Sequence, residues 1–148
     1  MTQVFAAACL VLVSATSAAA SPRVSTSQGI AAVTQEKRNR TAAQRKIDTQ
    51  LLYALYRERG EAETKGVPAG DLRVTFDAKR RALVTIRARV TADLLATIKR
   101  LGGEVVSSSE RDNDIRAYLP LGTLEALAAS KTVFAMAPAE EATTSRPK

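Results

Sequence analysis

Residues 83–138 constrain the fold of this chain most strongly, because their pattern changes repeatedly between strand and helix. Apolar residues alternate with polar ones in some segments and recur at three- and four-residue spacing in others. The resulting order is strand, helix, strand, strand, helix, strand. Two helices that bury Leu and Ile stripes can both lie on one face of a four-stranded antiparallel sheet. The pattern therefore predicts an α+β fold of the ferredoxin-like split β-α-β type.

Caps and breakers mark the element ends. We expect Thr91 to cap a helix that Gly102 ends, and Pro120 to end the third of the four strands. The remaining elements are strands at 104–109, 115–119 and 132–137 and a short helix at 121–130. We expect residues 71–138 to form this domain, followed by an extended tail over 139–148.

Two further elements are expected upstream. Thr41 and Gln44 have the spacing of a capping box, and an apolar stripe follows, so we predict one amphipathic helix over 41–60. Residues 72–76 and 84–90 alternate with period two around a polar turn, which predicts a hairpin and thus an extra strand. The stretch 21–40 lacks sustained apolar periodicity, so we expect a disordered arm there.

The amino-terminal residues are typical of a secretory leader. Residues 1–22 carry no charge, and Val4–Val13 is an apolar or small run too short to span a bilayer. Ala18-Ala19-Ala20 fits signal-peptidase cleavage before Ser21, so we expect residues 1–20 to be a signal peptide and the protein to be secreted or periplasmic. No basic residue precedes the apolar run, which leaves a retained anchor as the alternative. After cleavage we expect no stable membrane insertion.

The composition argues against catalysis and metal binding. The chain has no His, and its single cysteine, Cys9, lies in the leader, so we expect no enzyme activity, no cofactor and no metal site. The net charge is +7, yet there are six aromatic residues and no Trp, so we expect no nucleic-acid partner. The sequence carries no indication of the oligomeric state.

The sheet face away from the two helices is the candidate binding surface. If Val133 and Ala135 point at the helices, Phe134 and Met136 point the other way. The other side chains expected on this surface are Tyr118, Thr85, Arg87, Arg89 and Arg116. Such an apolar patch rimmed by arginine is typical of a partner surface. Two alternatives stay open: the helix 41–59 folds back over the patch, or the last strand has the opposite register.

The ordered set of these segments resembles the amino-terminal prodomain of secreted bacterial subtilisin-like serine proteases. The segments that carry the resemblance are Leu83–Ile86, Leu101–Val106, Ile115–Pro120, Leu124–Ala128 and Val133, with Ala43–Tyr53 upstream and Ala142–Ser145 in the tail. The similarity covers about residues 41–145.

The resemblance implies that the open sheet face lies on a protease while the tail occupies its substrate cleft as a product does. Such a prodomain both assists folding of the protease and inhibits it. By position, Tyr118, Phe134, Met136, Arg87, Arg89 and Arg116 would contact the enzyme. Ala142, Thr143, Thr144, Ser145 and the terminal Lys148 would lie in the cleft.

This chain departs from the family because only the tail follows Pro138, so protease activity is not carried over. We expect a free-standing inhibitor or folding helper, or the remnant of a truncated protease gene. The alternative is an extracytoplasmic interaction or small-ligand-binding module that uses the same fold.

Overall fold

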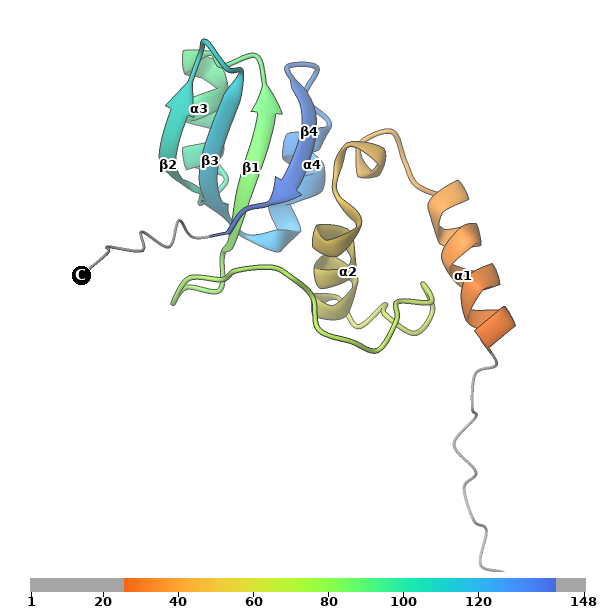
Figure 1. The fold of residues 1–148 in the computed structure, drawn as a ribbon. Coiled ribbons are helices and arrows are strands. Elements are labelled where there is room, and N and C mark those ends of the chain that lie inside the picture. The colour runs from red at the N-terminus through yellow and green to blue at the C-terminus, as the bar shows by residue number, and fades with distance from the viewer. Residues whose placement is uncertain (1–25, 141–148) are drawn as a thin grey trace, which may run out of the picture.

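The computed structural model describes residues 26–140 (Figure 1). The expected signal peptide and the cleft-binding residues of the tail lie outside this range. The described elements are α1 (Thr26–Arg38), η1 (Gln44–Lys46), α2 (Thr49–Glu58), β1 (Ala82–Ala88), α3 (Ala92–Arg100), β2 (Glu104–Ser109), β3 (Asp114–Leu119), η2 (Leu121–Thr123), α4 (Leu124–Ala128) and β4 (Val133–Pro138).

The strands form one antiparallel sheet in the order β2-β3-β1-β4. Within residues 82–138 the elements follow one another as strand, helix, strand, strand, helix, strand, as predicted. The predicted caps of α3 are also present, since Thr91 Oγ1 accepts from Leu94 N at 3.2 Å and Gly102 follows the helix with φ 81°. The protein is therefore a mixed α+β fold built on a four-stranded antiparallel sheet.

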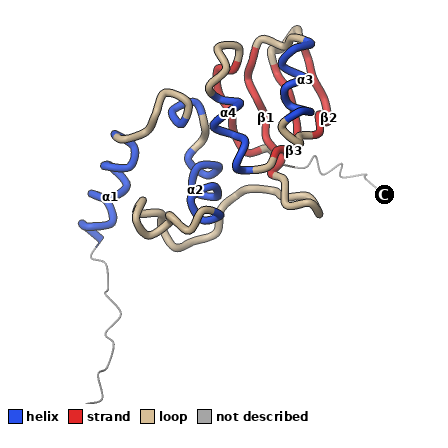
Figure 2. Tube along the Cα trace, turned by 180° about the vertical axis from the view of Figure 1, so that it is seen from behind, coloured by secondary structure: helices blue, strands red, loops and turns tan. Residues whose placement is uncertain are grey.

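Helices α3 and α4 cover the same side of the sheet, which is turned toward the viewer in Figure 2. The side chains that fill the space between them are Leu94, Ile98, Leu124, Leu127, Val84, Ile86, Ile115, Ala117, Leu119 and Val133, all buried. Along β3, and along β1 from Val84 onward, the buried residues alternate with more exposed ones, as expected when only one sheet face is covered.

The predicted helix over 41–60 is divided into two. Thr41 and Gln44 do form the capping box, with hydrogen bonds of 3.0 and 3.2 Å, but the turn that follows is only η1. Asp48 then caps α2, accepting from Gln50 N at 2.8 Å. The chain breaks at Ile47 because its backbone is extended and pairs in parallel with Met136 of β4. Tertiary pairing therefore overrides the helical pattern at this residue.

Helix α2 belongs to the same core as the sheet. Residues 51–56 are all buried, and α2 contacts η2 and β4. Asp48 N also donates to Met136 O at 2.8 Å, so the chain entering α2 covers the outer edge of β4. A domain limited to residues 71–138 would lack this part of the core.

The expectation of a disordered arm was wrong for residues 26–38, which form α1. This helix has little apolar patterning, so hydrophobic periodicity did not reveal it. It packs closely instead, since a Cβ placed on Gly66 would lie 2.6 Å from the Ala32 Cβ. Polar contacts to α2, described below, complete its attachment.

The predicted hairpin is present only at its turn. Asp77 Oδ1 accepts from Lys79 N and Arg81 N at 2.9 and 2.8 Å, but Phe76 and Ala82 form a single isolated bridge. The cause is that β1 has two edges, and β3 and β4 occupy them. Residues 72–76 therefore pair with β1 only where β4 has ended, and no extra strand forms.

Candidate protein-binding face

The sheet face opposite α3 and α4 carries no helix of the described chain, and we call it the open face (Figure 1). The strand register assigns its side chains, which are Glu104, Ser107 and Ser109 from β2, Asp114, Arg116 and Tyr118 from β3, Leu83, Thr85 and Arg87 from β1, and Ala135 and Ala137 from β4. Leu83 is buried at the end of this face where β4 ends. Helix α2 lies beyond the β4 edge and does not fold back over this face. Thr85, Arg87, Arg116 and Tyr118 are therefore placed together, as predicted.

Met136 does not belong to the open face, and the prediction that it does was wrong. The pairing of β1 with β4 shifts between Arg87, opposite Ala135, and Ala88, opposite Val133, so Phe134 is an extra residue. This β-bulge reverses the alternation after Phe134. Met136 consequently points into the core at 2% exposure, and Ala135, which was expected to face the helices, is exposed.

Phe134 is the main exposed apolar side chain beside the open face, at 55% exposure. It borders a shallow hollow together with Arg87, Asp112, Asn113 and Ala135. Phe and Arg are both enriched at protein interfaces relative to the rest of the surface. Phe134 is thus exposed next to Arg87 and Ala135, and the bulge, not simple alternation, places it there.

The arginines of this region differ in their partners. Arg87 and Arg89 are exposed, and neither forms an ion pair within residues 26–140. Arg81 is neutralised, because Nη2 lies 2.6 Å from Asp77 Oδ2 and 2.7 Å from Glu104 Oε2. Its guanidinium also lies over the Tyr118 ring at 5.8 Å, so Tyr118 is covered on one side.

Arg116 is half-buried near the middle of β3, opposite Thr85 of β1. Its Nη2 donates to the carbonyl oxygen of Glu140, just beyond β4. The Nε–H is buried and has no hydrogen-bond partner among the described residues. Arg116 therefore holds the chain after β4, a role that the sequence pattern did not indicate.

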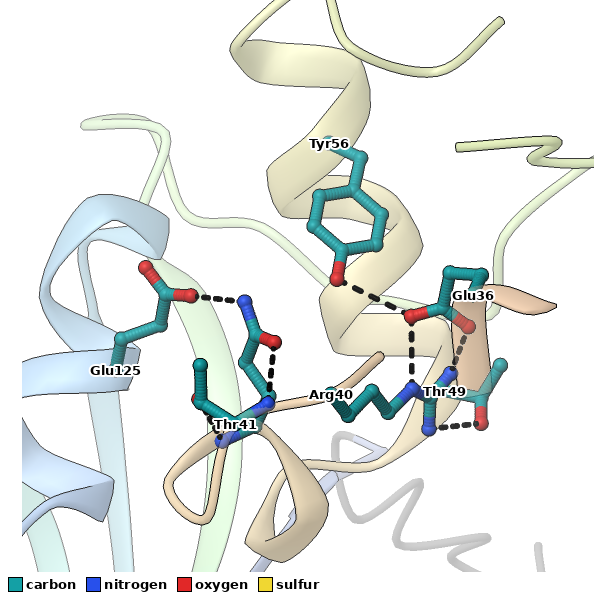
Figure 3. A network of polar contacts seen from close by, with 7 residues as sticks. Glu36, Arg40, Thr41, Thr49, Tyr56 and Glu125 are labelled. Carbon is teal, nitrogen blue, oxygen red and sulfur yellow. Dashed lines mark hydrogen bonds and ion pairs between the residues drawn. The ribbon is translucent and has the colours of Figure 1, made fainter. Parts of the chain in front are cut away.

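A buried ion pair at the end of α1, which is hydrogen-bonded to α2, was also missed (Figure 3). Glu36, at 7% exposure, accepts from Arg40 Nε and Nη2, both at 2.8 Å, and from Tyr56 Oη at 3.1 Å. Arg40 Nη1 donates to Thr49 Oγ1 at 3.3 Å. Burial, reinforced by the Glu36 carboxylate, raises the pKa of Tyr56 to about 12. Every Glu36 contact here is internal, so we assign this cluster a structural role.

A second polar cluster ties η1 and α2 to α4. Glu125 accepts from Gln44 Nε2 at 2.6 Å and from Arg59 Nη2 at 2.7 Å. Burial acts to raise the pKa of Glu125, but these hydrogen bonds outweigh it and lower the pKa. Because its partners are far apart in sequence, nothing in the local pattern indicated this contact.

A solvent-open hollow outside the sheet lies between α2 and the loop before β1. The residues that line it are Ala54, Arg57, Glu58, Leu72, Phe76, Arg80 and Leu121.

Within the described chain, no group of three or more acidic, His or Cys side chains is arranged to hold a metal ion. No helix of residues 26–140 has the length and apolar character needed to cross a bilayer.

Comparisons with protein-family models, with curated proteins and with solved structures found no match to this chain.

Proposed function

We propose that this protein is a secreted or periplasmic relative of protease prodomains, with a ferredoxin-like fold, that binds a subtilisin-like serine protease as an inhibitor or folding helper. The observation that carries the proposal is the open face. The four-stranded antiparallel sheet has α3 and α4 on its other side, and its last strand leads directly into the tail. The resemblance of the sequence to such prodomains indicates a subtilisin-like serine protease as the class of partner.

The open face has properties that suit a protein partner. It is rich in small residues, and Phe134, Arg87 and Arg89 lie at one end, where neither arginine forms an ion pair within residues 26–140. Interface cores are enriched in aromatic residues and arginine. We propose Phe134, Arg87 and Arg89 as direct contacts, with Tyr118 contributing beside Arg81. Met136 is not proposed as a contact because it is buried.

The tail supplies the second half of the proposed mechanism. Ten extended residues after Pro138 reach at most about 33 Å, enough for several subsites of a protease cleft. Strand-like main chain pairs with the edges of such a cleft, and side chains fill its pockets. We propose that Ala142, Thr143, Thr144 and Ser145 bind in this way, with Lys148 as the candidate for the first specificity pocket if the tail binds like a product.

Titration against proteases tests the proposal. The chain from Ser21 to Lys148 is added to a panel of subtilisin-like enzymes while hydrolysis of a chromogenic peptide is followed. We expect saturable inhibition at submicromolar concentration, and Phe134→Arg serves as the matched variant because it changes the face and leaves the core intact. Rapid digestion without inhibition across the panel would contradict an inhibitor role and favour the remnant of a truncated protease gene.

The alternative, a small-ligand module, would use the hollow beside α2. Its rim includes Phe76, 45% exposed, with Arg57 and Arg80. Small-molecule sites combine an apolar lining with a few polar groups. Chemical-shift changes on addition of a ligand would then cluster at this hollow, whereas a protease partner would shift residues of the open face.

A further inference from the structure

The chain does not leave the sheet where β4 ends. Beyond Pro138, Ala139 N donates to Leu83 O at 3.0 Å, and Ala139 is 6% exposed. This hydrogen bond continues the pairing of β1 with β4 by one more residue. Glu140, the next residue, is exposed. Ala139 is thus the last residue that pairs with β1, and the contacts of Glu140 decide the direction in which the chain leaves the sheet.

Arg116 holds that residue from another strand. In the order β2-β3-β1-β4, Arg116 lies on β3, two strands from β4. Neighbouring strands are about 4.8 Å apart, so a chain that continued straight along β4 would stay about 10 Å from β3. The Arg116 side chain crosses β1 to make this contact, so Nη2 reaches Glu140 O only if the chain after Ala139 stays close to the open face.

From this geometry we infer that Arg116 is a positioning residue, which directs the tail across the open face as it leaves β4. The inference rests on the proposed function only for the use of the tail in a protease cleft. Arg116 suits the task because it is half-buried in the middle of a strand, and a guanidinium offers a fork of donors to backbone carbonyls. Its buried Nε–H remains available for a further acceptor.

Fixing the first residues of a tail increases affinity without adding a contact to the partner. A restrained tail samples fewer directions, so its effective concentration at a nearby cleft rises. It also loses less conformational entropy when it becomes ordered in the cleft. Arg116 would thus act on binding through residues 141–148 and not through its own contact with the protease.

A spin-label experiment tests the direction of the tail without any protease. Thr144→Cys, in the chain that starts at Ser21, supplies one labelling site because Cys9 is in the leader. In the parent protein the spin label should broaden amide signals of β2 and β3. This broadening should decrease in Arg116→Gln and persist in Arg87→Gln, which removes the same charge from the same face. Equal broadening in the parent and in Arg116→Gln would overturn the inference.

Measurements of affinity for the protease then separate positioning from direct contact, because binding can be measured for chains with and without the tail. We expect Arg116→Gln to weaken binding of the full chain about tenfold, equivalent to about 1.4 kcal/mol. Binding of a chain that ends at Glu140 should be unaffected by the same substitution, a comparison that forms a double-mutant cycle. An equal loss in both chains would show that Arg116 contacts the protease directly and overturn the positioning role. If no protease is inhibited at all, the proposed function fails, and the spin-label result still decides the role of Arg116.

Discussion

Met136 lies directly opposite Ile86 in the β1–β4 pairing, and both side chains are buried on the helix-covered side of the sheet. Two residues earlier, Phe134 is exposed beside the open face. In a regular strand Phe134 and Met136 would share one face. The bulge at Phe134 therefore decides which of the two stabilises the fold and which is available to a partner.

Substitution of these two residues should have opposite effects. Met136→Ala leaves a cavity in the core and should lower the free energy of unfolding by about 2–5 kcal/mol. Phe134→Ala removes an exposed ring and should change it by less than about 1 kcal/mol. Urea unfolding followed by far-ultraviolet circular dichroism measures both. A larger loss for Phe134→Ala than for Met136→Ala would contradict the bulged register.

Phe134→Arg should weaken binding of the protease partner while leaving stability close to that of the parent. The side chain is exposed, so an arginine there meets water in the free protein, but it buries an additional charge in the complex. The loss in affinity should be about tenfold or more. Val106→Arg, which places the same charge on another exposed residue at the β2 edge, is the control. Unfolding of Phe134→Arg would show that the ring has a structural role.

Truncation after Glu140 should abolish protease inhibition and leave the thermal unfolding midpoint unchanged. Ala139 must be kept, because it is buried and bonded to Leu83. A second chain that ends at Pro138 should therefore be less stable than the one that ends at Glu140. Inhibition that persists in both truncated chains would exclude a product-like role for the tail.

Removal of the segment before the sheet should have a graded effect. A chain that starts at residue 71 loses Leu51, Leu52 and Leu55, all fully buried, and we expect it not to fold. A chain that starts at Asn39 loses α1 alone and should remain folded with lower stability. Amide signal dispersion in NMR spectra distinguishes the outcomes. A folded chain from residue 71 onward would mean that α2 is not part of the cooperative unit.

Stability should fall in alkali through Tyr56. Its pKa is about 12 in the folded protein and about 10 in an unfolded chain, so the unfolded state loses its proton first as the pH rises. The full contribution is present below pH about 10 and is lost as the pH rises toward about 12, a change of up to about 3 kcal/mol. Tyr56→Phe should lack this component in urea unfolding measured across the range. Parallel pH profiles for the two proteins would contradict a buried phenol hydrogen-bonded to Glu36.

The amino-acid sequence by itself determined the order of elements within residues 82–138 and the caps of α3, because these depend on local backbone preference and on the period of apolar residues. It also placed Phe134 and the arginines Arg87 and Arg116 in one region. Only the tertiary structure decided the bulge that buries Met136, the break at Ile47, the loss of the extra strand and the docking of α1 through Glu36. Each of these depends on a partner distant in sequence, such as Tyr56 for Glu36, or on an edge of the sheet already occupied, and the spacing of neighbouring residues does not encode either.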